Sequence, residues 1–209
     1  DVLMRQKKFE DATKAYEAGF AKAASSALAI RRYKARARAG HTDAALAQLK
    51  DWVVANKDRA GHHVLASAYI STSRFDDAIR ESEELLFDDP KNAVLLNNLA
   101  WLYQQKKDKR ATEYAERALK QAPRSAAVMD TLGWILLDAN DRARGLDLLR
   151  KAKSMAPRHG DIHYHFAAAL DRNGKKSEAR RELQDLIDSQ INFSKIKEAR
   201  AMLKKLRGG

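Results

Sequence analysis

The sequence predicts an all-α fold in which helix hairpins recur about every 34 residues and stack in a line. The first observation is the stretch 126–157, where two segments with apolar residues three and four apart flank the polar hinge Asp138-Ala139-Asn140-Asp141. Such spacings are helical, and the hinge cannot continue the apolar stripe. This stretch therefore predicts two helices joined as a hairpin.

The second observation is one small residue that recurs on the second helix of each hairpin, at intervals of 33, 33, 33, 34 and 34 residues. Its copies are Ala12, Ala45, Ala78, Ala111, Gly145 and Ala179. Pro90, Pro123 and Pro157 keep the same interval, as do Tyr69 and Tyr103 on the first helices. Because a single hairpin cannot bury its own apolar face, this period predicts neighbours stacked into one array over residues 1–209.

Small, aromatic and proline positions in this order and at this period resemble the tetratricopeptide repeat (TPR). The resemblance covers nearly the whole chain. It implies a right-handed superhelix, or α-solenoid, of about five to six hairpins closed by a C-terminal capping helix. The predicted units are a partial repeat at 1–24, repeats at 25–58, 59–92, 93–125, 126–159 and 160–192, and the capping helix at 193–207.

The two ends of the chain differ from the repeats. At the C-terminus Ser194 is the expected N-cap of a helix with one apolar stripe, which suits a cap over the last apolar face. That stripe is Ile196, Ala199, Leu203 and Leu206. At the N-terminus, residues 9–22 form a second helix whose partner is mostly missing. We therefore expect a C-terminal fragment of a longer protein, and predict that the incomplete repeat contacts a second copy of the chain.

Composition removes several classes of function. The chain has no cysteine, which excludes disulfides, thiolate zinc sites and cysteine nucleophiles. It contains no HExxH, Gly-rich phosphate loop or Gly-x-Ser-x-Gly motif, so neither catalysis nor a cofactor is predicted. His159 and His163 are four residues apart, but His165 points to a different face from His163 and no third ligand lies nearby at suitable spacing, so no metal site is predicted. No apolar run reaches the ~18 residues that span a bilayer.

The net charge of +12 raises the question of nucleic-acid binding. The 40 basic residues are spread over every helix and interleaved with 28 acidic ones. A solvated outer face accounts for most of them. Nucleic acid or an anionic membrane remains an alternative partner, to be bound by the basic helix around 31–38 and by the C-terminal helix.

The resemblance implies that first-helix positions 2, 5, 6, 9, 12 and 13 of each 34-residue unit line a concave groove that binds a protein or peptide. The residues at the matching positions are Asn97, Asn98, Trp101, Gln104 and Gln105; Asp130, Thr131, Trp134 and Asp138; Tyr164, His165, Asp171 and Arg172; His63 and Ser67; and Arg31, Lys34 and Arg38. The two asparagines resemble those of TPR carboxylate clamps. The lysine and arginine partners of that clamp are missing, which argues against capture of a carboxyl terminus in that form.

Trp101 and Trp134 occupy equivalent positions in adjacent repeats, so we expect them side by side across the groove. Exposed indoles next to amides are good anchors for an extended peptide or for the face of a sugar. The alternative is that both rings pack between adjacent first helices. The sequence leaves both interpretations open, and direct glycan binding is kept as an alternative function.

The favoured hypothesis is a non-catalytic scaffold that binds a protein partner. Residues 95–123 and 128–157, and the runs ARRELQDLI and EARAMLKKL, resemble the large bacterial TPR proteins that accompany exosortase (PEP-CTERM) and exopolysaccharide export systems. That similarity implies a location in the cell envelope, with the periplasm favoured over the cytoplasm. It also implies a role in assembling secretion or polysaccharide machinery.

Overall fold

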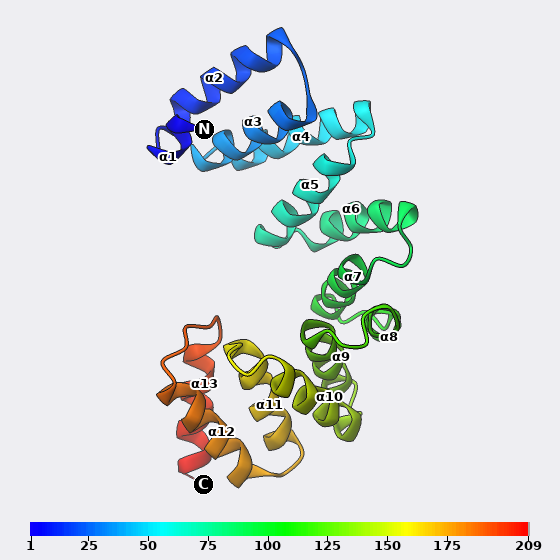
Figure 1. The fold of residues 1–209 in the computed structure, drawn as a ribbon, viewed down its shortest axis with the longest axis vertical. Helices are drawn as coiled ribbons and strands as arrows, with labels where there is room; N and C mark the ends of the chain where they lie inside the picture. The colour runs from blue at the N-terminus through cyan, green and yellow to red at the C-terminus, as the bar shows by residue number, and fades with distance from the viewer. Residues whose placement is uncertain (209) are drawn as a thin grey trace. The chain divides into compact units, whose positions relative to one another are not determined.

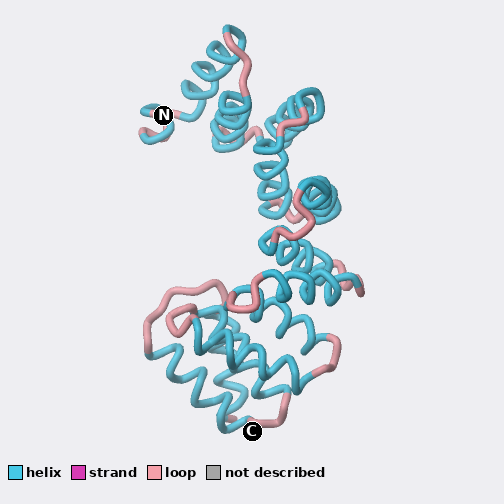
Figure 2. The backbone as a smooth tube through the Cα atoms, turned by 45° about the vertical axis from the view of Figure 1, so that its right-hand side comes forward, coloured by secondary structure: helices cyan, strands magenta, loops and turns pink. Residues whose placement is uncertain are grey.

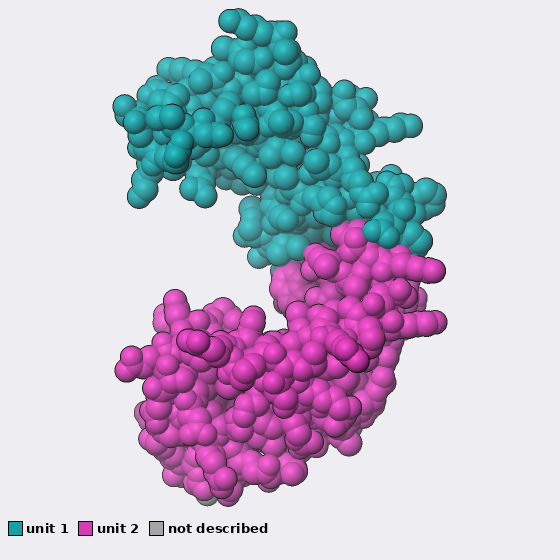
Figure 3. All heavy atoms as spheres, viewed as in Figure 1, with its two compact units in different colours: residues 1–90 teal, residues 91–209 magenta. Residues whose placement is uncertain are grey.

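The structure is a computed structural model that describes residues 1–208, and this part of the chain contains thirteen helices and no strand (Figures 1 and 2). The predicted all-α class is confirmed. The helices fall into two compact units, Asp1–Pro90 and Lys91–Gly209, which Figure 3 colours separately. Each unit is described by itself.

The first unit contains α1 to α6. Their bounds are Val2–Arg5, Phe9–Lys22, Ser26–Arg38, Thr42–Asn56, Arg59–Ser71 and Phe75–Asp88. Consecutive helices pack against each other from α1 to α5, and α5 packs against α6. α3 also contacts α5, so these two first helices lie next to each other.

The second unit contains α7 to α13. Their bounds are Ala93–Gln105, Arg110–Gln121, Ala126–Asp138, Arg142–Met155, Gly160–Arg172, Lys176–Asp188 and Ile196–Arg207. The hairpins are α7–α8, α9–α10 and α11–α12. The first helices also touch one another, α7 against α9 and α9 against α11, while α13 packs on α12. The first helices therefore form a layer in which residues one repeat apart meet.

The small residue of each second helix is buried in every hairpin. Ala12, Ala45, Ala78, Ala111 and Ala179 are at most 5% exposed. At Gly145 the approach is closest, because a Cβ there would lie 2.8 Å from the carbonyl oxygen of Gly133 on the paired helix. The expected close contact between the two helices of a hairpin is confirmed.

Side chains at the helix starts account for several helix boundaries. Ser25, Asn92 and Ser125 precede α3, α7 and α9 in extended backbone conformations, and each accepts a hydrogen bond from a backbone N–H in the first turn. Gly40 follows α3 with φ of +98°, a left-handed conformation that glycine adopts at helix ends. Asn140 has φ of +66° in the predicted hinge, a conformation that asparagine tolerates better than most residues.

Tyr69 and Tyr103 are buried at equivalent places in α5 and α7, and each lies under an arginine. The Arg74 guanidinium carbon is 4.7 Å from the ring centre of Tyr69, and that of Arg110 is 4.2 Å from the ring centre of Tyr103. The Tyr103 hydroxyl also accepts a hydrogen bond from Arg110 Nη1 at 3.1 Å. The repeated tyrosine thus fastens a first helix to the start of the second helix.

The closing helix α13 buries Ala199 and Leu203 against α11 and α12, with Ile196 and Leu206 packed beside them. The predicted apolar stripe is confirmed. The N-cap prediction is wrong: α13 begins at Ile196 after Lys195, and the Ser194 side chain makes no cap bond. Asp161 holds Ser194 instead, which keeps the serine outside the helix.

No helix within residues 1–208 combines the length and the apolar character needed to cross a membrane.

Candidate functional site

In the first unit the predicted groove residues lie on the surface of α3 and α5. Arg31, Lys34, Arg38, His63 and Ser67 are all exposed. Arg31 pairs with Asp1 at 3.7 Å, and Lys34 and Arg38 border a hollow of about 660 Å³ together with α1. The predicted groove residues of the first unit therefore include no aromatic side chain.

In the second unit, polar side chains one repeat apart bond to each other across the layer of first helices. Gln104 Nε2 donates to Asp138 Oδ2 at 2.9 Å, and Arg172 Nη1 donates to Asp138 Oδ1 at 2.7 Å. This row joins α7, α9 and α11. Asp130 and His165 form a second link, with His165 Nδ1 2.9 Å from both carboxylate oxygens. The groove face is therefore an ordered polar surface.

One cavity of about 550 Å³ opens on this face; we call it the aromatic pocket. Its lining comes from α7, α9, α11, the segment before α13, and α13 itself. The lining residues are Trp101, Gln104, Gln105, Asp130, Thr131, Trp134, Asp161, Tyr164, His165, Ser194, Lys195 and Glu198. Its volume is within the range of about 300–1,000 Å³ that is usual for ligand sites.

Trp134 is held by contacts on α11. Its ring stacks on His165 with centroids 4.5 Å apart and planes at 26°, and the Arg172 guanidinium carbon lies 4.7 Å from its ring centre. The indole also packs on the core cluster that includes Leu137, Leu149 and Phe166, yet stays partly exposed. Trp134 thus packs between first helices and borders the cavity at the same time.

Trp101 is also partly exposed, and it lines the same cavity as Trp134. For Trp134 the two interpretations offered by the sequence are therefore not exclusive, because this ring both packs on the core and borders the cavity. An aromatic ring already fixed by packing loses little conformational entropy when a ligand arrives, which favours it as an anchor.

The Asp130–His165 pair orients the imidazole that covers Trp134. The side chains of the aspartate and the histidine are only 15% and 19% exposed. Because Nδ1 faces two acceptor oxygens, it carries a proton and donates to them. The carboxylate therefore fixes both the tautomer and the direction of the ring.

A third group of polar side chains surrounds Tyr164 at the α13 end of the pocket. Asp161 Oδ1 accepts from Ser194 N at 3.1 Å and from Ser194 Oγ at 2.7 Å. Glu198 pairs with Lys195 at 3.4 Å.

Burial raises the pKa of Tyr164, and the nearby negative charge of Glu198 raises it further. A backbone hydrogen bond lowers the pKa of Glu198, helped by Lys195. The phenol is thus neutral and the carboxylate ionised at neutral pH.

The structure does not bring every predicted residue to this pocket. It gathers Trp101, Gln104, Gln105, Asp130, Thr131, Trp134, Tyr164 and His165. Asn97 and Asn98 lie on α7 outside the lining, and the Oδ1 atom of Asn97 is buried with no hydrogen-bond partner within residues 1–208. Asp171 borders a separate hollow beside Lys176 and the end of α13.

Four lining residues were not among the predicted ones: Asp161, Ser194, Lys195 and Glu198. Asp161 is the second residue of α11, a place that the family resemblance already assigns to the groove. That position was the signal for it. Ser194, Lys195 and Glu198 belong to the closing segment, which we expected only to cap the array and to expose a basic face to solvent.

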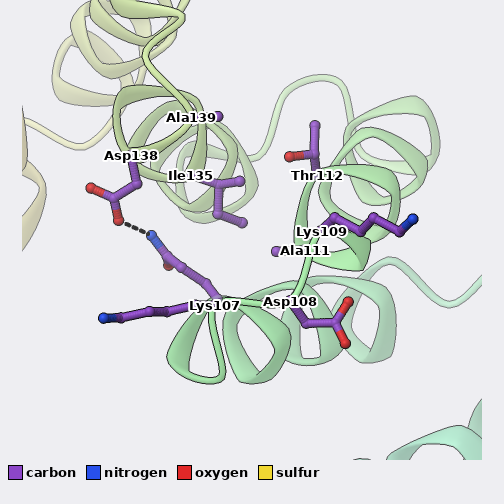
Figure 4. A pocket seen from close by; sticks show the side chains of 9 residues that line it. Lys107, Asp108, Lys109, Ala111, Thr112, Ile135, Asp138 and Ala139 are labelled. Carbon is purple, nitrogen blue, oxygen red and sulfur yellow. Dashed lines mark hydrogen bonds between the residues drawn. The ribbon is translucent and has the colours of Figure 1, made fainter.

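A second cavity of about 570 Å³ lies at the α7–α8 turn, and Figure 4 shows its lining. Ile135, Ala111 and Thr112 surround its centre, while the charged ends of Lys107 and Lys109 extend away from one another. Gln104 borders both cavities, and its bond to Asp138 is the dashed line in the figure. Gln104 and Asp138 are the predicted groove residues that border this second cavity.

Among residues 1–208 no group of three or more His, Cys, Asp and Glu side chains is arranged to hold a metal ion. His163 and His165 serve different surroundings: His165 faces the groove, whereas the Nε2 atom of His163 is buried without a hydrogen-bond partner in the described part of the chain.

A family model described as "Tetratricopeptide repeat" matches residues 63–126 and 131–194, which is more than half of the chain. The chain belongs to the tetratricopeptide repeat family. The TPR fold is typical of non-catalytic scaffolds that mediate contacts between proteins.

Solved TPR structures share the fold at low sequence identity. A TPR protein from Parabacteroides merdae ATCC 43184 is 16% identical with a TM-score of 0.79, covering 99% of this chain and 80% of that one. YrrB, described as a TPR protein with an unusual peptide-binding site, is 16% identical with a TM-score of 0.63, covering 86% and 94%. MamA from Desulfovibrio magneticus RS-1 is 19% identical with a TM-score of 0.67, covering 79% and 96%.

Among curated proteins, anaphase-promoting complex subunit 3 of Schizosaccharomyces pombe is 26% identical over 114 residues. This match takes in 54% of the present chain but only 17% of that protein. The TPR similarity therefore concerns a small part of the larger relative.

Proposed function

We propose that this chain is a scaffold that binds a polypeptide segment of a protein partner, and that the aromatic pocket holds that segment. The observation that carries the proposal is that Trp101, Trp134 and Tyr164, from three successive first helices, border one cavity together with amide and carboxylate groups. Large aromatic side chains dominate the energy of protein recognition, and the adjacent polar groups can bond to a peptide backbone.

The pocket side chains are held in place by contacts within the protein, which supports this function. His165 and Arg172 hold Trp134, and Asp130 and Asp138 in turn hold those two residues. A ligand that enters a surface already fixed in this way avoids part of the entropic cost of binding. YrrB, a TPR protein of similar fold with an unusual peptide-binding site, supports a peptide as the class of ligand.

The finer context stays a prediction from sequence resemblance. Residues 95–123 and 128–157 resemble TPR proteins of exosortase and exopolysaccharide systems, and from this we propose that the scaffold belongs to a bacterial envelope assembly. Fractionation of the source cells tests the location: recovery of the chain in the cytosol alone would contradict it.

The binding function is tested with peptides selected from a random display library on the full chain. Affinities are measured by tryptophan fluorescence in a Trp52→Phe background, so that the signal comes from Trp101 and Trp134. Thr131→Tyr fills the aromatic pocket and is expected to weaken binding by about tenfold or more. Thr112→Tyr adds the same group to the cavity of Figure 4 and is the matched control.

If Thr112→Tyr weakens binding and Thr131→Tyr does not, the aromatic pocket is not the peptide site. Oligosaccharides are titrated to millimolar concentration in the same assay. A saturating response to sugar, with none to any selected peptide, would replace peptide binding by the glycan alternative. Circular dichroism of each variant controls for loss of fold.

A further inference from the structure

The aromatic pocket has a charge opposite to that of the chain. The protein carries a formal net charge of +12, but the pocket lining contains three carboxylates, Asp130, Asp161 and Glu198, against the single ammonium of Lys195. At an ionic strength of 0.15 M, charges more than about 8 Å away are largely screened. A ligand in the cavity therefore experiences the local acidic groups more strongly than the basic outer surface.

Asp161 has no ion-pair partner within residues 1–208. Its Oδ1 atom accepts from Ser194, through a neutral N–H and a neutral hydroxyl. Such bonds favour the ionised carboxylate without neutralising it. A cation entering the pocket would meet this negative charge directly.

Asp161 and Glu198 both lie near Tyr164, and all three side chains line the aromatic pocket. Asp161 and Tyr164 are three residues apart on α11, so their side chains are neighbours on one helix face. Glu198 on α13 is near enough to raise the pKa of the Tyr164 phenol by its charge. The α13 end of the pocket thus combines an aromatic ring with two carboxylates.

The protein itself shows how such a combination holds a guanidinium group. Arg172 lies over Trp134, with 4.7 Å between its guanidinium carbon and the ring centre, and donates to the Asp138 carboxylate at 2.7 Å. An aromatic ring and a carboxylate thus engage one arginine on the same groove face. Tyr164, Asp161 and Glu198 supply the same kinds of group, an aromatic ring and carboxylates.

We propose that the aromatic pocket selects a partner segment by an arginine side chain, whose guanidinium group binds between Asp161 and Glu198 against Tyr164. This rests on the proposed peptide-binding function and adds the class of side chain that the pocket takes. Arginine is preferred to lysine because its planar group stacks on aromatic rings and bonds two carboxylate oxygens at once, whereas the lysine ammonium is compact and strongly hydrated.

The test uses blocked glycine- and serine-rich peptides with one central residue, either arginine, lysine, citrulline, leucine or glutamate. Binding to the full chain is followed by the NMR signals of the Trp101 and Trp134 indole N–H groups. The arginine peptide is expected to bind about tenfold more tightly than the citrulline peptide, which has nearly the same shape and no charge. Free spermidine is included as a cation without a peptide.

Asp161→Asn combined with Glu198→Gln is expected to weaken arginine-peptide binding by about tenfold. The matched control is Glu178→Gln. Glu178 on α12 pairs with Lys175 three residues earlier, as Glu198 pairs with Lys195, but Glu178 lies outside the pocket. The control should leave binding unchanged.

Equal affinity for arginine and citrulline peptides, or an unaltered affinity in the double variant, would overturn the inference. So would spermidine or the lysine peptide binding as tightly as the arginine peptide. Tight binding of the leucine peptide with no preference for charge would reject arginine selection and leave peptide binding intact. Failure of every library-selected peptide to respond to Thr131→Tyr would instead remove the pocket as a peptide site.

Discussion

Gly133 and Gly145 bring the two helices of the α9–α10 hairpin into backbone contact. A Cβ on Gly145 would lie 2.8 Å from the carbonyl oxygen of Gly133, and a Cβ on Gly133 would lie 3.0 Å from that of Gly145. Real Cβ atoms essentially never come nearer than 3.0 Å to such an atom, and a backbone carbonyl cannot rotate away as a side chain can. The pair therefore determines how near α9 lies to α10.

Gly145→Ala should therefore destabilise the protein by about 1–3 kcal/mol, because the added methyl group forces the hairpin apart. The comparison is Gly19→Ala on α2, where the nearest atom to an added Cβ is Leu28 Cδ2 at an ordinary 3.7 Å. That change should stabilise by about 0.5–1 kcal/mol, since alanine is the better helix former. Urea unfolding measures both. Equal stability of Gly145→Ala and the parent would show that the helices can separate without cost.

Asp58 should contribute more to the stability of the fold than an ordinary helix cap does. It accepts from Gly61 N at 3.2 Å at the start of α5, and from Trp52 Nε1 at 2.8 Å on α4. Asp58→Ala removes a cap worth about 0.5–2 kcal/mol and leaves an indole N–H without its acceptor. We expect a loss near the upper end of that range in thermal unfolding.

The control for that change is Ser25→Ala, since Ser25 caps α3 through a single bond from Leu28 N at 3.4 Å. Ser25→Ala should lower the stability of the protein less than Asp58→Ala does. If Ser25→Ala costs as much as Asp58→Ala, the bond from Trp52 to Asp58 adds nothing to stability.

Asp108 should titrate far below a normal aspartate. Hydrogen bonds from the Arg110 side chain and backbone lower its pKa from 3.8 to about 2. Because the folded pKa is depressed, the stability it contributes is complete above the unfolded value and is lost as pH falls from 3.8 through about 2. NMR titration of the side-chain carboxyl measures this. Arg110→Ala should move the midpoint up toward 3.8, and an unmoved midpoint would contradict the assignment.

His163 should make the second unit sensitive to mild acid. Burial lowers its pKa below 6.5, and the charge of Lys153 adds to this effect. The unfolded chain therefore binds the proton more readily, so the stability contributed by the neutral ring is complete above 6.5 and is lost as pH falls through the folded pKa. Comparing urea unfolding of the parent and His163→Gln at pH 7.5 and pH 5 isolates the effect. The parent should lose more stability on acidification; parallel losses would exclude it.

The elements that sequence predicted best are those that repeat. Ala78, Ala111 and Gly145 were found from their interval alone, because only a small residue permits the close contact that recurs in each hairpin. The interval also fixes which first-helix residues share a face, and so Asp130 and His165, which come from adjacent repeats, could be assigned to one surface.

Features outside the period were harder to predict. Ser194 looked like a cap because it precedes an apolar stripe, but Asp161, from a helix one repeat earlier, captures both its N–H and its hydroxyl. Periodicity gives the face of a residue and not its exposure. It could not show that Trp134 both packs on the core and borders a cavity, since that depends on where His165 and Arg172 lie.

The aromatic pocket is assembled from α7, α9, α11 and α13, which belong to separate modules that otherwise contact mainly their immediate neighbours. In such arrays the end modules fray first, because stability is roughly a sum of local terms. An occupant of the pocket would bridge modules that are not adjacent in sequence, and unfolding of the last module would then require its release. The bound partner would thus couple the modules, so that a succession of partial unfolding steps becomes one cooperative unfolding transition.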